Sequence, residues 1–188
     1  HWENGVGGNV GESQGYIPGD IQVRSDALEK QGWPKLISAS DWIPFLKQAL
    51  QDIPETDGKK SIGLTTTFAE PWGLQGIAGI GYEKGEHMTG AAGNNAVIWN
   101  HTENLFVDYF LCEEAIETVR WFNELYREGI LDQESFTDLY QQTVDKVKSG
   151  QALAIWYSGW ASGEANQAFS DAGKPEMRYV GIPFQLDS

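Results

Sequence analysis

The chain has little cysteine, histidine or positive charge. Its 188 residues include one Cys, three His and 13 Lys and Arg against 27 Asp and Glu, for a formal net charge of −14. Cys112 alone cannot close an internal disulfide, and with so few histidines it does not complete a zinc site. The scattered cations do not form the basic stripe that nucleic acid requires, and the negative balance also disfavours an anionic membrane surface.

Long apolar runs are absent as well. No stretch of about 18 apolar residues could span a bilayer. The segment from His1 to Asn4 does not begin a basic region followed by an apolar one, so no signal peptide is expected in this chain. The length suits one domain of ordinary size, and a hydrophobic fraction of 40% is too high for a disordered chain.

Tryptophan, by contrast, is abundant. The chain has eight Trp, and several of them stand beside Gly, Ser and Glu in expected loops. Because indole rings are costly to expose, such positions suggest a ligand surface. Sugars suit a surface of this kind, since their apolar C–H faces stack on indole while carboxylates accept bonds from their hydroxyl groups.

The hydrophobic pattern predicts strands that alternate with helices, which indicates an α/β fold. Strands are expected at 21–24, 61–66, 96–99, 105–109, 152–157 and 177–183. Helices are expected at 26–31, 41–52, 113–127 and 139–149, with another that opens within 158–163. Ser40 is the predicted N-cap of the second helix. Residues 1–19 are predicted to be a Gly-rich irregular lead-in, 54–60 a turn and 84–95 a polar loop.

Two of these helices carry an apolar face. The face of helix 41–52 is formed by Trp42, Phe45, Leu46, Ala49 and Leu50, and that of helix 113–127 by Ile116, Val119, Phe122, Leu125 and Tyr126.

Two loops that follow expected buried strands are the best candidates for a binding site. In open α/β sheets, ligands bind beyond the carboxyl ends of the strands. The first loop offers Glu70 and Trp72. The second offers Tyr157, Ser158 and Trp160 at a helix N-terminus, where free N–H groups favour ligand oxygens. The alternatives are a solvated carboxylate for Glu70 and a buried anchor for Trp160.

Other candidates are weaker. Asp57-Gly58, with Glu55 and Thr56, resembles a calcium loop without its regularly spaced oxygen ligands, so no metal is predicted. The three histidines have no nucleophile motif nearby. A glycosidase needs two carboxylates that face one bond, and the sequence does not pair Glu70 with a second acid. No cofactor is predicted.

The second half of the chain resembles bacterial extracellular solute-binding proteins of family 1, the sugar receptors of ABC importers. Residues 114–132, EAIETVRWFNELYREGILD, are similar to the helix of that family that ends in "ely.eGlid". Residues 147–160, VKSGQALAIWYSGW, are similar to its "f.sGkaam…G.w" strand and helix start. Residues 23–32, VRSDALEKQG, resemble its "yRkDlleKaG", and 40–50 and 57–64 resemble its next helix, turn and strand. The resemblance covers about 21–183 in the correct order.

The resemblance implies a receptor and not an enzyme. Such receptors have a type II periplasmic-binding-protein-like fold, in which two α/β lobes, each a mixed sheet flanked by helices, are joined by hinge strands. By this likeness, 1–20 is the lead-in and hinge crossing, and 21–188 is the second lobe without its N-terminal partner lobe. The implied partners are a sugar or oligosaccharide and the membrane subunits of an ABC importer. The implied location is extracellular, as an anchored lipoprotein, or periplasmic.

The same likeness assigns roles to the two candidate loops. In maltodextrin-binding relatives, the first loop reads "EPYF" and supplies a carboxylate and a stacking aromatic. Glu70, Trp72 and Gly73 in EPWG occupy matching positions, with Gly73 in place of the last aromatic. Trp160 matches the stacking aromatic of "GPWAW". Two other classes stay open: a glycoside hydrolase, and a free-standing carbohydrate-binding module, which is usually a β-sandwich.

Overall fold

The computed structural model describes residues 21–71, 73, 88–89, 97–100, 103–108, 111, 113–156, 159–182 and 184. The expected lead-in at 1–20 lies outside these residues. Within them, the predicted alternation of strands and helices is confirmed, and the chain folds as a mixed α/β structure.

The central sheet has four strands in the order β4-β8-β1-β9. They are β1 (Ile21–Arg24), β4 (Ile62–Thr65), β8 (Ala152–Trp156) and β9 (Tyr179–Ile182). β4 and β8 are parallel, whereas β1 runs antiparallel to both β8 and β9. Every residue of β8 is buried, which explains why this strand is an unbroken apolar run.

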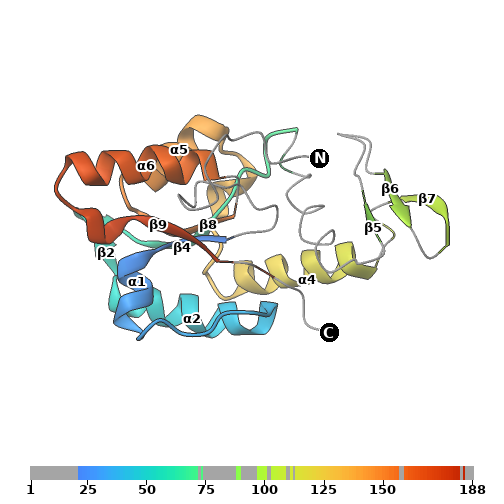
Figure 1. Cartoon of the computed structure of the whole chain (residues 1–188), viewed down its shortest axis with the longest axis horizontal. Coiled ribbons are helices and arrows are strands. Elements are labelled where there is room, and N and C mark those ends of the chain that lie inside the picture. The colour runs from blue at the N-terminus through green and yellow to red at the C-terminus, as the bar shows by residue number, and fades with distance from the viewer. Residues whose placement is uncertain are drawn as a thin grey trace.

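Helices cover both faces of this sheet (Figure 1). α5 (Tyr140–Lys148) and α6 (Gly159–Asp171) lie on one face, and α1 (Ser25–Lys30), α2 (Ala39–Asp52) and α4 (Glu113–Arg127) on the other. Each layer has its own apolar core, because one buried cluster joins α2 and α4 to the sheet and another joins α5 and α6 to it. Two short 3₁₀ helices, Gln133–Phe136 (η3) and Pro175–Met177 (η4), complete these layers.

Two smaller sheets lie outside the central one. β2 (Glu55–Thr56) and β3 (Lys59–Lys60) form a hairpin within the predicted turn. Asp57 and Gly58 have φ angles of 49° and 78°, which suits the two-residue turn between such strands. The strands expected at 96–99 and 105–109 are confirmed as β6 (Val97–Asn100) and β7 (Leu105–Asp108), which pair as an antiparallel hairpin. The loop expected at 84–95 is corrected in part, because Met88–Thr89 forms β5 and pairs with β6.

Helix α2 begins two residues earlier than predicted, so Ser40 is not its N-cap. The N-cap is Ser38, and the reason is the side chain of Asp41. Its carboxylate accepts hydrogen bonds from the backbone N–H of Ser38 and of Ile37, at 3.0 and 2.9 Å. These two bonds, with that of Ser38 the stronger influence, lower the pKa of Asp41 below its ordinary value. A Ser followed three residues later by an acid is a capping box, and it fixes the start of the helix.

Helix α4 has the predicted bounds but packs through a rotated face. The buried side chains are Ala115, Thr118, Trp121, Phe122 and Leu125. Three members of the predicted apolar face are instead exposed: Ile116, Val119 and Tyr126 have 41%, 48% and 43% of their surface accessible. The large ring of Trp121 accounts for the rotation, since it packs against Phe122 in the core and its indole N–H donates to the Ala39 carbonyl at 3.0 Å.

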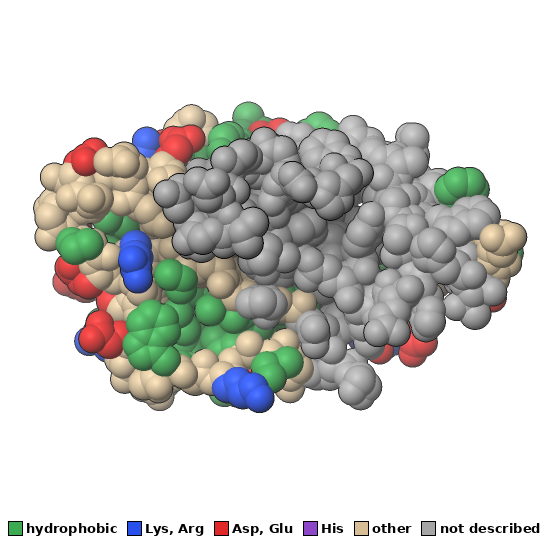
Figure 2. Space-filling model, viewed as in Figure 1, with side chains coloured by type: hydrophobic (Ala, Val, Ile, Leu, Met, Phe, Trp, Pro, Cys, Tyr) green, Lys and Arg blue, Asp and Glu red, His purple; other side chains and the backbone are tan. Residues whose placement is uncertain are grey.

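Hydrophobic side chains also gather on the surface beside α1 and α2 (Figure 2). In the connection between these helices, Trp33 and Ile37 are 55% and 43% exposed. Trp33 has a φ of 57°, in the left-handed region, and follows Gly32 with a φ of 71°. Both backbone N–H groups bond back to the last turn of α1, so this connection is a helix-ending motif that turns an aromatic residue outward.

Candidate functional site

The two loops chosen from the sequence follow neighbouring parallel strands. In the register of β4 and β8, Leu64 pairs with Ala154 and Thr65 with Ile155. The chain therefore leaves both strands at the same edge of the sheet, the edge where ligands bind in open α/β folds. β1 starts and β9 ends at this edge too, because Ile21 pairs with Trp156 on one side and Ile182 on the other.

The loop after β4 is held by buried polar contacts. The Thr66 N–H donates to Ser135 Oγ at 3.1 Å, and the Thr66 hydroxyl donates to the Trp156 carbonyl at 2.9 Å. Farther on, the Glu70 N–H bonds to the Thr67 carbonyl and the Gly73 N–H to the Glu70 carbonyl. The two bonds of Thr66 therefore fix the start of the loop to β8 and to η3, and the other two bonds hold the loop to itself.

Gly73 is where the chain folds back on this loop. A Cβ atom at Gly73 would lie 1.9 Å from the Thr67 carbonyl oxygen and 2.9 Å from Phe68 Cα. No residue with a side chain fits there without movement of the backbone. An aromatic residue, which stands at the matching position of the maltodextrin-binding pattern, would therefore not fit at Gly73 in this structure.

Glu70 caps helix α5. Its Oε1 accepts the backbone N–H of Tyr140, the first residue of that helix, at 2.9 Å. The N–H groups of a first helical turn have no partner within the helix, so a carboxylate there is stabilising. Glu70 is half-buried and lies at the edge of the sheet. It is thus neither free in solvent nor fully enclosed.

Phe136, which sequence reasoning did not single out, lies beside the same loop. It ends η3, is 53% exposed, and stacks on Phe68 with ring centroids 5.3 Å apart. Phe68 in turn meets Phe122 of the core edge-on at 4.9 Å. Leu139, which immediately precedes Tyr140, is 56% exposed. No local motif marks these residues, because long-range contacts bring them to Glu70.

The other predicted site residues are those of the loop after β8, with Trp72 in the first loop. Trp72, Tyr157 and Ser158 lie outside the described residues. The backbone of Trp160 is in the first turn of α6, as predicted. The structure therefore brings Glu70 and the start of α6 to one edge, and the assigned contacts of the four aromatic and hydroxyl side chains stay predictions.

Asp57 has a structural role. Besides forming the hairpin turn, its carboxylate accepts two bonds from Lys174 Nζ, at 2.9 and 3.1 Å. Within the part of the chain that is described, no cluster of acidic, His or Cys side chains is arranged to hold a metal ion. No described helix combines the length and apolar character needed to cross a membrane.

A surface groove of about 400 Å³ lies between α2 and α4. Its lining includes Ile43 and Pro44 of α2 and Glu117, Arg120 and Trp121 of α4. It is in the helical layer, not at the strand ends, and Glu70 is not among the described residues that line it.

The same arrangement occurs in solved solute-binding proteins. An HMO-binding ABC-transporter-associated solute-binding protein from Bifidobacterium longum infantis matches 94% of this chain at a TM-score of 0.64 and 16% identity, over 35% of its own length. The Streptococcus pneumoniae substrate-binding protein FusA, solved with kestose, matches 95% at a TM-score of 0.57 and 16% identity, over 34% of its length. The chain has the fold of part of a periplasmic solute-binding protein.

A third structure of this fold is the GacH receptor of Streptomyces glaucescens, solved unliganded and with acarbose and an acarbose homolog. It matches 92% of this chain at a TM-score of 0.50 and 20% identity, over 40% of its length. This chain thus spans little more than a third of the solute-binding proteins that it resembles. No family model and no curated protein sequence matches it. The resemblance seen in the sequence is confirmed at the level of fold.

The two threonines at the start of the β4 loop give a matched pair for testing how it is held. The Thr67 hydroxyl is buried and has no partner among the groups that the structure describes, whereas Thr66 donates to Trp156. Thr66→Val should lower the free energy of unfolding by about 1 to 3 kcal/mol, and Thr67→Val should leave it unchanged or raise it. Urea denaturation measures both, and equal losses in the two variants would contradict this reading.

Proposed function

We propose that this chain is the ligand-binding part of a sugar or oligosaccharide receptor that serves an ABC importer. The observation that carries the proposal is the shared edge of β4 and β8, because the Glu70 loop follows one of these parallel strands and the start of α6 follows the other. The ligands printed for the structural neighbours, kestose for FusA and acarbose for GacH, support a carbohydrate as the ligand class.

The proposed contacts follow from the chemistry of sugars. Trp72 and Trp160 stack on the apolar faces of the rings. The second carboxylate oxygen of Glu70, together with the hydroxyl groups of Tyr157 and Ser158 and the first N–H groups of α6, bonds to the sugar hydroxyls. Stacking sets the affinity, and the polar groups orient the ligand.

The proposed mechanism is closure, without chemistry. β1 and β9 reach the site edge side by side, which suits strands that cross to a second lobe. A ligand that bridges two lobes would shift the equilibrium toward a closed form, which the importer's membrane subunits recognise. We place such a receptor outside the cell or in the periplasm, with a lipid anchor as one option. One lobe alone supplies half of the contacts, so affinity near or weaker than about 1 mM is expected.

The test is an NMR titration of the Trp indole N–H signals with maltotriose, kestose and related oligosaccharides up to tens of millimolar. Signals that Trp72→Phe and Trp160→Phe assign should shift together for one sugar class, with the sugar unchanged. Appearance of hydrolysis products would replace the receptor by a glycoside hydrolase. Full-strength, micromolar binding by this chain alone would favour a free-standing binding module, and the absence of any shift would remove the support for sugar.

Glu70→Gln separates the two roles of that residue. The amide oxygen of Gln still accepts the Tyr140 N–H, so the melting temperature should change little, while loss of the charged acceptor should weaken sugar binding about tenfold. Glu70→Ala removes the cap as well and should also lower the free energy of unfolding by about 1 kcal/mol. A Glu70→Gln variant that binds sugar as the wild type does would limit Glu70 to helix capping.

A further inference from the structure

Phe136 is an exposed aromatic ring with a fixed orientation. One face leans on Phe68, at 5.3 Å and 27° between the ring planes, and Tyr126 meets it edge-on at 6.0 Å. Phe68 is itself held by Phe122 of the core. More than half of the Phe136 surface nevertheless remains accessible. Two aromatic neighbours, one of them fixed by the core, therefore hold in place a ring that the protein does not bury.

Phe136 and its stacking partner Phe68 lie on the two segments that the Glu70 carboxylate joins. Phe68 precedes Glu70 in the loop after β4, and Phe136 precedes Tyr140, whose N–H binds the Glu70 carboxylate. The turn between Phe136 and Tyr140 is fixed by hydrogen bonds of the Thr137 and Asp138 N–H groups to the Glu134 carbonyl, at 2.8 and 2.7 Å. An exposed aromatic ring and a carboxylate acceptor are thus carried by two segments that the Phe68–Phe136 stack and the Tyr140–Glu70 hydrogen bond join.

We infer that Phe136 is a further stacking platform, which binds a second ring of an oligosaccharide beside the ring held at Glu70. The inference rests on the proposed function and extends it: the site takes an oligosaccharide rather than a single sugar. A sugar ring presents an apolar C–H face to an aromatic and hydroxyl groups to a neighbouring carboxylate, and this pairing matches Phe136 and Glu70. The site extends from the start of α6 across the β4 loop to η3.

The test compares trisaccharide and monosaccharide binding in matched variants. NMR titrations of the full chain with maltotriose and kestose, and with glucose and fructose, give the dissociation constants. Phe136→Leu should weaken trisaccharide binding roughly 3- to 10-fold and leave monosaccharide binding unchanged. Phe106→Leu is the control, since Phe106 is 65% exposed but lies on β7 of a different sheet. Phe106→Leu should change neither the trisaccharide nor the monosaccharide dissociation constants.

Phe136→Tyr keeps the ring and should retain trisaccharide binding, which separates stacking from a loss of folding. If the wild type binds trisaccharides and Phe136→Leu binds them equally well, the platform is overturned while the receptor function stands. An equal loss for monosaccharides also overturns it, because the effect would then lie at the Glu70 ring. If the wild type binds none of the sugars, the proposed function itself fails, and the platform with it.

Discussion

Replacing Lys146 with methionine is expected to lower the free energy of unfolding by about 3 to 5 kcal/mol. The ammonium group of Lys146 lies among three carboxylates, with Nζ at 2.7 Å from Asp132 Oδ2, 2.7 Å from Glu134 Oε2 and 2.6 Å from Asp138 Oδ2. The Lys146, Asp132 and Asp138 side chains are only 12%, 6% and 8% exposed. Methionine fills a similar volume but leaves the carboxylates facing one another without a counter-charge.

The matched control is Lys148→Met in the same helix. Lys148 pairs with Glu164 at 3.4 Å, and both side chains are exposed, so its loss should cost no more than about 1 kcal/mol. Urea denaturation at neutral pH measures both variants. If both variants lost similar amounts of unfolding free energy, the burial of Lys146 would contribute nothing to the stability of the protein.

The contribution of Lys146 should also be independent of pH over the physiological range. Burial by itself lowers the pKa of Lys146, but hydrogen bonds to Asp132, Asp138 and Glu134 outweigh it and raise the pKa above the ordinary 10.5. A raised pKa in the folded state means that the stabilisation is complete below the unfolded value and is lost only as the pH rises above it. The difference between wild type and Lys146→Met should therefore stay constant from about pH 7 to pH 9.

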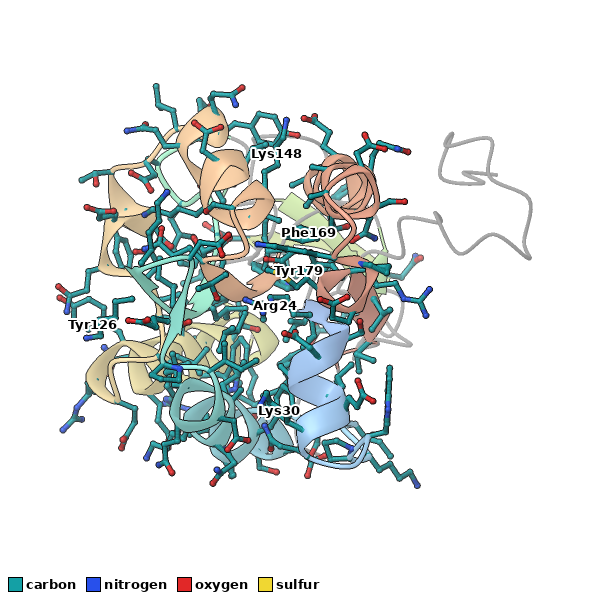
Figure 3. All side chains as sticks on the ribbon, turned by 90° about the vertical axis from the view of Figure 1, so that its left-hand side faces the viewer. Arg24, Lys30, Tyr126, Lys148, Phe169 and Tyr179 are labelled. Atoms are coloured by element: carbon teal, nitrogen blue, oxygen red, sulfur yellow. The ribbon has the colours of Figure 1, made fainter. Side chains whose placement is uncertain are left out.

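Arg24→Met is the second substitution expected to have a large effect, about 3 kcal/mol or more. Arg24 is 2% exposed and lies at the centre of the molecule near Tyr179 (Figure 3). Its Nη1 donates to the Gly150 carbonyl at 2.5 Å and to Thr56 Oγ1 at 2.8 Å. Its Nε and Nη2 bind the two oxygens of Asp26 at 3.0 and 2.5 Å. One guanidinium thus ties β1 to the β2–β3 hairpin, the end of α5 and the start of α1.

Arg24→Lys keeps the charge but cannot reproduce the planar fork, so an intermediate loss is expected. Arg127→Met, at the exposed end of α4, is the control and should change stability by less than about 0.5 kcal/mol. Thermal and urea unfolding measure the series. If Arg24→Lys were as stable as the wild type, the charge alone would account for the role of Arg24.

The sequence allowed the elements to be located because their signals are local. α4 and α5 end close to their predicted bounds, since Gly129 and Gly150 adopt φ angles of 69° and 71° that favour glycine. β8 was visible as an apolar run because every one of its residues is buried. The start of α2 was misplaced because two serines, Ser38 and Ser40, both suit an N-cap, and only the reach of Asp41 decides between them.

The candidate site could be predicted only in part. Its place at the strand ends followed from the α/β pattern, and Glu70 from its position after β4. That Glu70 caps α5 depends on a contact with Tyr140 across 70 residues of sequence. The exposure of Phe136 depends likewise on which face of its ring Phe68 covers. Both contacts join residues that lie far apart in the sequence, so the helix and strand periods of the hydrophobic pattern do not indicate them. The rotation of α4 was missed for the same reason, because its partners are distant in the chain.

The pairing of β1 has a consequence for how the protein folds. β1 is the first described strand, yet both of its neighbours, β8 and β9, lie far from it in the sequence, and the Arg24–Gly150 hydrogen bond spans 126 residues. Closing such long loops is slow, because chain entropy must be lost before the contacts form. During synthesis, β1 cannot complete its pairings until both β8 and β9 have been made. We therefore expect the sheet to fold slowly, and only after β9 has left the ribosome.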